Sequence, residues 1–206
     1  MDPGMICVFT GIDGAGKTTR VIPEIVMHLQ NDMVLNHIEW RPVTVLKSPT
    51  TFMEHMSSVI SNSKSPLVKA TIQMADNYKH MNTCLSRSIK GDIVISDRWW
   101  YDAFVYNYLE LSDSVGSRAA ERILKEMYPN VAVVSPTVCF LCIVPPDVAH
   151  ARKPDYPIEF MERVFERYVK VSRNMFEMEY IDCCDVDAAV DQIYRKIVAH
   201  IDGADR

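Results

Sequence analysis

The feature that most constrains this chain is a glycine-rich segment that runs from Gly11 to Thr18. It reads Gly-Ile-Asp-Gly-Ala-Gly-Lys-Thr and matches the pattern G-x-x-x-x-G-K-[ST] of a phosphate-binding loop. An apolar run, residues 5–9, precedes it, and a helix-like stretch, residues 17–30, follows, which is the context that the motif requires. Glycines let the backbone amides face phosphate oxygens, and the start of a helix adds partial positive charge. The segment therefore predicts a P-loop.

The last residues of this loop carry its expected chemistry. In such a loop the lysine, here Lys17, contacts the β and γ phosphates of ATP, and the hydroxyl of Thr18 ligates Mg²⁺. ATP and Mg²⁺ are therefore the predicted cofactors. The loop residues expected to hold the donor nucleotide are Gly11, Asp13, Gly14, Ala15, Gly16, Lys17, Thr18 and Thr19.

Short apolar runs alternate with longer helix-like stretches along the chain. This alternation predicts an α/β fold with a parallel sheet and helices on both faces, and we expect residues 1–206 to form a single domain. Pro23 lies beyond the first turn of its helix and is expected to bend it. The predicted strands are residues 5–9, 43–46, 92–96, 137–144 and 179–181. The predicted helices are residues 17–30, 51–61, 66–90, 99–111, 117–127, 158–176 and 187–201.

The third predicted strand is followed directly by Asp97 and Arg98. An acid at a strand tip beside a P-loop can hold Mg²⁺ or its water, and an adjacent arginine can bind a second phosphate through paired hydrogen bonds. GTPases instead need a guanine-reading Asn-Lys-x-Asp and a D-x-x-G switch after a later strand, which this sequence lacks. We therefore predict a phosphotransferase in which Lys17, Asp97 and Arg98 are catalytic, with Thr18 and Asp97 at the metal.

A basic, proline-containing stretch at residues 149–157 predicts a loop between the fourth strand and the next helix. Its Arg152 and Lys153 could close over the phosphates and neutralise charge in the transition state. The alternative is a solvated basic turn. On the first interpretation this stretch is a lid, with Arg152 as a catalytic residue and Lys153 as an ATP contact.

The composition argues against several classes of function. The formal net charge is −5, so no general attraction for nucleic acid is expected. No apolar run reaches the ~18 residues of a membrane span, and no basic leader precedes an apolar stretch, so we expect a cytoplasmic protein. Cys139 and Cys142 have zinc-like spacing, but a strand would turn them to opposite faces, so buried free thiols are expected.

Several segments together resemble the thymidylate kinase family of nucleoside monophosphate kinases. Residues 9–19 look like the family's P-loop, and residues 97–99, Asp-Arg-Trp, look like its Asp-Arg-Tyr. Residues 136–146, 160–168 and 180–182 resemble its fourth strand, the helix after its lid and its last strand. The resemblance covers nearly the whole chain. It implies a P-loop NTPase fold with a five-stranded parallel sheet in the order 2-3-1-4-5, and a homodimer.

The resemblance also implies the roles of residues around small-molecule nucleotide substrates. Asp13 would bind the 3′-hydroxyl of the acceptor sugar, and Arg98 would bind the acceptor phosphate. Tyr106 would crowd the sugar C2′ and favour deoxyribose. The remaining implied contacts are Lys47 at the acceptor, Tyr156 in the lid, and Cys184 and Val186 along the adenine of ATP.

The acceptor pocket departs from the family pattern at Gln73, Asn77 and Asp102. The first two stand where a base-stacking phenylalanine and a base-contacting arginine are usual, and Asp102 stands where serine is usual. Gln73 and Asn77 share one helix face, and their amides can hydrogen-bond a base edge. dTMP is the expected acceptor, and dUMP, a 5-modified pyrimidine and dGMP are the alternatives. The missing ring could be replaced by Trp100, Tyr101 or Phe104.

Two other functions are compatible with a P-loop. A deoxynucleoside kinase would need a glutamate at the second strand tip to deprotonate a neutral hydroxyl, but Lys47 and Ser48 stand there, and a cation suits a phosphorylated acceptor. A non-catalytic nucleotide-binding module would have no need of a lid arginine such as Arg152. A nucleoside monophosphate kinase is therefore the function that the sequence favours.

Overall fold

The computed structural model describes residues 4–128, 134–174 and 178–203. Its five strands form one sheet in the order β2-β3-β1-β4-β5, and every neighbouring pair is parallel, which confirms the predicted order. The strands are β1 (Met5–Thr10), β2 (Val43–Lys47), β3 (Ile93–Asp97), β4 (Val138–Ile143) and β5 (Glu179–Asp182).

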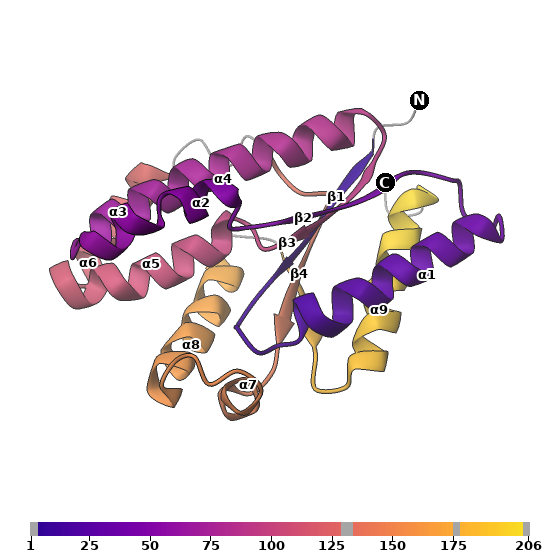
Figure 1. Cartoon of the computed structure of the whole chain (residues 1–206). Helices are drawn as coiled ribbons and strands as arrows, with labels where there is room; N and C mark the ends of the chain where they lie inside the picture. The colour runs from indigo at the N-terminus through magenta and orange to yellow at the C-terminus, as the bar shows by residue number, and fades with distance from the viewer. Residues whose placement is uncertain (1–3, 129–133, 175–177, 204–206) are drawn as a thin grey trace.

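Helices cover both faces of this sheet, as Figure 1 shows. On one side α1 (Ile22–Val34) and α9 (Val186–Ile201) lie together, and on the other α4 (Pro66–Ile89) packs against α5 (Trp100–Val115), which also contacts α8 (Ile158–Asn174). The shorter helices are α2 (Thr51–His55), α3 (Ser57–Asn62), α6 (Ser117–Met127) and α7 (Pro146–Arg152). Within the described parts of the chain, none of these helices is long and apolar enough to span a membrane.

The central strands are buried because helices lie on both sides of them, and their sequences are correspondingly apolar throughout. The register places Phe9 of β1 beside Asp97 of β3, and Asp97 beside Lys47 of β2. The carboxyl ends of three neighbouring strands therefore deliver the P-loop, Asp97 and Lys47 to one edge of the sheet. Ligands of open α/β sheets bind at this edge.

Several local predictions need correction. The loop predicted at residues 149–157 is wrong in its first part, because α7 continues to Arg152 and uses Pro146 in its first turn, where proline is tolerated. Residues 17–21 form a π-helical turn before α1, and Pro23 falls in the first turn of α1 instead of its interior. The helix predicted at residues 51–61 is divided into α2 and α3, and Trp99 precedes α5 as its N-cap. The predicted end of the helix at residues 158–176 lies outside the described residues.

The cysteines are free thiols. Cys139 and Cys142 are both buried in β4. Among the described residues there is no group of three or more His, Cys, Asp or Glu side chains placed to hold a metal ion.

Candidate active site

The P-loop joins β1 to the π-helical turn and packs directly against α7. At Gly14, which has φ +84°, a Cβ atom would lie only 2.2 Å from the carbonyl oxygen of Ala149. No other residue type fits both this backbone conformation and this approach. Gly14 therefore brings the loop into direct contact with α7, the helix that ends in Arg152.

The side chain of Lys17 folds back along the loop. It is buried, and its Nζ donates hydrogen bonds to the carbonyl oxygens of Gly11 (2.7 Å) and Ile12 (2.9 Å). These bonds compensate for the burial of the ammonium group and fix its position inside the loop. The positive charge lies where the loop amides would surround a phosphate.

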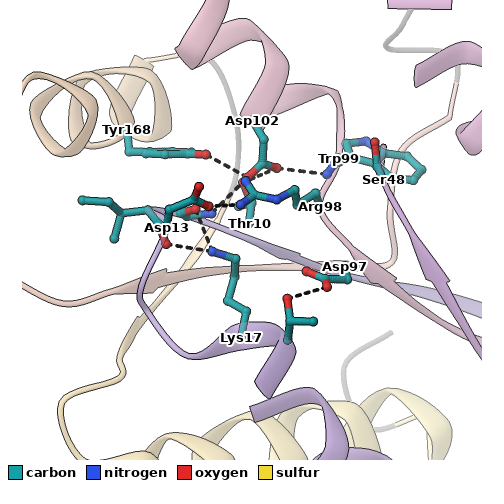
Figure 2. A network of polar contacts seen from close by, with 12 residues as sticks. Thr10, Asp13, Lys17, Ser48, Asp97, Arg98, Trp99, Asp102 and Tyr168 are labelled. Atoms are coloured by element: carbon teal, nitrogen blue, oxygen red, sulfur yellow. Dashed lines mark hydrogen bonds and ion pairs between the residues drawn. The ribbon is translucent and has the colours of Figure 1, made fainter. Parts of the chain in front are cut away.

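Thr18 and Asp97 meet at the carboxyl edge of the sheet, where Figure 2 labels Asp97. The Thr18 hydroxyl donates to Asp97 Oδ2 at 2.6 Å, while Asp97 Oδ1 is buried and has no hydrogen-bond partner among the described residues. Burial raises the pKa of Asp97, although the hydrogen bond from Thr18 and the charge of Lys17 act in the opposite direction. A hydroxyl and a carboxylate oxygen without a partner are the hard oxygen ligands that Mg²⁺ prefers, so this pair fits the predicted metal.

Arg98 is held in an uncommon conformation between two carboxylates. Its φ is +82°, in the left-handed region that non-glycine residues rarely adopt, and its backbone N–H donates to the Phe9 carbonyl at 2.9 Å. The guanidinium contacts Asp13 and donates to Asp102 Oδ1 at 3.2 Å. Burial lowers the pKa of Arg98, but the charge of Asp102 together with the contributions of Tyr168 and Tyr106 more than offsets it, so the net direction is upward. The fork of Arg98 is thus preorganised for an anionic group.

Asp102 connects three separate parts of the chain. Its carboxylate accepts from the Thr10 hydroxyl (2.8 Å), the Trp99 backbone N–H (3.0 Å) and the Tyr168 hydroxyl (2.8 Å), besides Arg98. Figure 2 shows these partners converging on one carboxyl group from β1, the segment before α5, and α8. The side chain is 6% exposed. The predicted role of Asp102 in contacting the acceptor remains a prediction, but its oxygens are engaged mainly by the protein.

Two cavities meet at this network. One, of about 400 Å³, lies between α4 and α5, and the other, of about 560 Å³, lies over the P-loop. We call them the acceptor cavity and the donor cavity. The residues that line both are Asp13, Thr18, Lys47, Arg98 and Lys153.

Most of the predicted site residues line one of these cavities. The donor cavity has, besides the shared residues, Gly14, Ala15, Gly16, Lys17, Thr19, Arg152 and Val186. The acceptor cavity has Gln73, Asn77, Asp102, Tyr106 and Tyr156. Gly11 lies against Cys142 and Cys184 is exposed, and neither residue lines the donor cavity. Asp97 does not line either cavity, but it is hydrogen-bonded to Thr18, which lines both.

The cations of the predicted lid approach the P-loop from α7. Arg152 donates to the Cys183 carbonyl at 3.4 Å, and its Nη1 lies 4.0 Å from the point where a Cβ of Gly16 would stand. Lys153 Nζ lies 3.4 Å from Asp13 Oδ2. Both cations therefore face the phosphate-binding loop in the described geometry.

The base-reading role of Gln73 and Asn77 remains a prediction, although both residues line the acceptor cavity. Asn77 is 3% exposed and engaged by the protein, since it accepts from Ser48 Oγ (3.5 Å) and donates to the Tyr128 hydroxyl (3.4 Å). The proposal that Trp100, Tyr101 or Phe104 supplies a ring to the cavity is wrong, because Trp100 stacks on Tyr128 and none of the three lines the cavity. The aromatic residues that do line it are Trp99, Tyr106 and Tyr156.

Sequence reasoning missed Lys69 and Glu110, which line the acceptor cavity and form an ion pair between α4 and α5. One signal was present, because Lys69 precedes Gln73 by one helical turn and so shares its face. Glu110 is on another helix, and no pattern within α4 points to it.

Comparisons with known proteins agree with this geometry. The family model described as "Thymidylate kinase" matches residues 9–196. The chain belongs to the thymidylate kinase family. It is therefore an ATP-dependent phosphotransferase of the nucleoside monophosphate kinase type.

Relatives from distant organisms match over most of the chain. A thymidylate kinase of Plasmodium falciparum is 26% identical over 204 residues, which cover 96% of this chain and 90% of the relative. One from Paracidovorax citrulli is 28% identical and covers 80% of this chain and 78% of the relative. A probable thymidylate kinase of Thermococcus onnurineus is 26% identical and covers 96% and 97%.

Proposed function

We propose that this kinase transfers the γ-phosphate of ATP to the 5′-phosphate of a deoxynucleoside monophosphate, with dTMP as an acceptor and dTDP as the product. The family and the curated thymidylate kinases that resemble the chain support this acceptor. The observation that carries the proposal is the wall of shared residues between the donor and acceptor cavities. A donor phosphate in one cavity and an acceptor phosphate in the other both lie against these shared residues, so the two phosphates are neighbours.

The charged residues of the two cavities suit this task. Lys17 and the loop amides hold the phosphates of ATP, and the fork of Arg98 holds the acceptor phosphate together with Lys47. Asp13 contacts both Arg98 and Lys153, so it positions these cations. The acceptor oxygen attacks the γ-phosphorus in line while the bond from the γ-phosphorus to its bridging oxygen breaks and ADP leaves. Positioning and charge account for most of the catalysis in this reaction class.

Arg152 is proposed as the cation that stabilises transferred charge. The P-loop has no side chain at Gly14, and Arg152 lies over Gly16 at the end of α7. Residues from 149 to about 157 are proposed as the lid, with Tyr156 on its acceptor side. Thr18 and Asp97 would hold Mg²⁺, which when bound neutralises phosphate charge.

Other assignments are proposals of the same kind. Tyr106 lines the acceptor cavity where a ring would crowd the sugar, and Val186 lines the donor cavity where adenine would lie, with Cys184 beside it. We also propose a single domain over residues 1–206, a homodimer and a cytoplasmic location.

A coupled assay of ADP release with nucleosides and nucleotides tests this function. We expect ADP release with dTMP, at most weak release with thymidine, and no release without an acceptor. Preferred turnover of thymidine would instead indicate a deoxynucleoside kinase. Binding of ATP without turnover of any acceptor would indicate a non-catalytic module.

A further inference from the structure

The end of the acceptor cavity that lies away from the P-loop is lined by polar side chains. On α4 it presents Lys69 and Gln73, and on α5 it presents Tyr106 and Glu110. Lys69 and Glu110 form an ion pair that joins the two helices, and each side chain is about one-third exposed. Charged side chains at this position are unnecessary for a cavity that encloses only an apolar base edge and a methyl group.

The polar groups of this wall are incompletely satisfied by the protein. Gln73 Oε1 is buried and has no hydrogen-bond partner among the described residues, and the same holds for Trp99 Nε1 in the same cavity. Buried polar atoms are normally paired, so an unpaired one beside a binding cavity can be satisfied by a ligand or by water. Gln73 offers an acceptor, and Trp99 offers a donor. Asn77, in contrast, is engaged by Ser48 and Tyr128.

The distance along α5 relates the ion pair to the phosphate site. Glu110 follows Asp102 by eight positions, which at about 1.5 Å per residue is about 12 Å along the helix. Asp102 holds Arg98, the proposed acceptor-phosphate ligand, at the inner end of the cavity. Glu110 and Lys69 therefore lie at the opposite end, where the base edge furthest from the phosphate would be.

We propose that Lys69, Gln73 and Glu110 form a polar distal subsite, and that the kinase also phosphorylates deoxynucleoside monophosphates whose base carries a hydrogen-bonding group beyond the edge of thymine. A hydroxyl or amino group there donates to Glu110, and a hydroxyl or carbonyl oxygen accepts from Lys69. This inference rests on the proposed function, since it needs the acceptor phosphate at Arg98.

The test uses dTMP, 5-hydroxymethyl-dUMP and dGMP as acceptors for the full chain. These probes place a polar group on different sides of the base. For at least one of the two polar probes, we expect a kcat/KM that is no more than about threefold below the value for dTMP. Values more than about tenfold below dTMP for both probes would overturn the proposal.

Two variants test whether the ion pair between Lys69 and Glu110 causes the preference for a polar base. Glu110→Gln should lower kcat/KM of the favoured polar probe, relative to dTMP, by about tenfold, the typical worth of one hydrogen bond to a charged group. Asp113→Asn is the matched control, because Asp113 is also on α5 and pairs with an arginine of another helix, Arg163, outside the cavity. It should leave the ratio unchanged.

The alternative is that the ion pair only clamps α4 to α5. In that case Glu110→Gln lowers the melting temperature, or lowers kcat/KM for all acceptors by a common factor. The ratio of kcat/KM between the polar probe and dTMP then stays unchanged, and the subsite is refuted. A failure of the proposed function would look different, because neither dTMP nor any other monophosphate would then be phosphorylated.

Discussion

Replacing Asp102 by asparagine tests whether the buried carboxylate holds the site together. The substitution keeps the shape of the side chain but removes its charge and turns one acceptor oxygen into an NH₂ donor. If the new NH₂ takes the place of Oδ2, it faces the Thr10 hydroxyl, which can rotate to accept, and the Trp99 backbone N–H, which cannot. If it takes the place of Oδ1, it faces Arg98 and the Gly11 backbone N–H, which cannot accept, and the Tyr168 hydroxyl, which can rotate to accept.

The magnitude follows from these partners. A buried N–H left without an acceptor and a weakened charge-assisted bond to Arg98 together cost about 3 kcal/mol. For a chain of this size that corresponds to a fall in melting temperature of about 6–12 °C. Because Arg98 loses the charge that fixes its fork, the KM for dTMP should also rise about tenfold, whereas the KM for ATP should change less.

Thermal unfolding and steady-state kinetics of the two α5 variants check this prediction. Asp113→Asn is the control, since Asp113 is exposed and its ion pair with Arg163 is of the surface type that contributes little to stability. A melting temperature within about 2 °C of the wild type, with an unchanged KM for dTMP, would refute the role given to Asp102.

Three further predictions concern single residues. Lys17→Ala should abolish turnover with every acceptor, whereas Arg98→Ala should mainly raise the KM for the acceptor, and steady-state kinetics with each substrate varied in turn separate the two effects. Arg152→Ala should lower kcat by about 10³-fold with little change in ATP affinity, and a near-normal kcat would show that this arginine does not act in the transition state. Burial lowers the pKa of His80 from its ordinary value near 6.5, so below that pH the unfolded chain binds the proton more readily and stability falls as the pH falls. His80→Gln should therefore lose less stability than the wild type as the pH falls from about 7 to the lowered pKa of His80. Urea unfolding at several pH values measures this loss, and equal losses in both proteins would contradict this account.

The sequence contained enough information to predict the sheet and most of the residues that line the donor cavity. The apolar runs of β1, β3 and β4 are continuous because these strands are covered on both faces, and the strand order followed from the family resemblance. The P-loop motif fixes Lys17 and Thr18 by spacing alone, since the loop and the helix start determine where both side chains lie. Local pattern therefore suffices where one continuous segment builds the function.

The acceptor side depends on contacts between segments that are distant in sequence. The partners of Asp102 include Thr10 and Tyr168, and no periodicity within α5 identifies either of them. Likewise, the ion pair of Lys69 with Glu110 joins two helices, and its place in the cavity follows from how α4 packs on α5. The left-handed backbone of Arg98 is equally invisible in a sequence, because tertiary contacts impose it.

The most direct test of the central claim follows the phosphoryl group itself. The purified chain is incubated with Mg²⁺, dTMP and ATP labelled at the γ-phosphate, and the nucleotides are then separated. Transfer between the two adjoining cavities predicts that the label appears in dTDP, in an amount equal to the ADP formed. ADP accompanied by labelled inorganic phosphate, with no labelled dTDP, would contradict the two-site account.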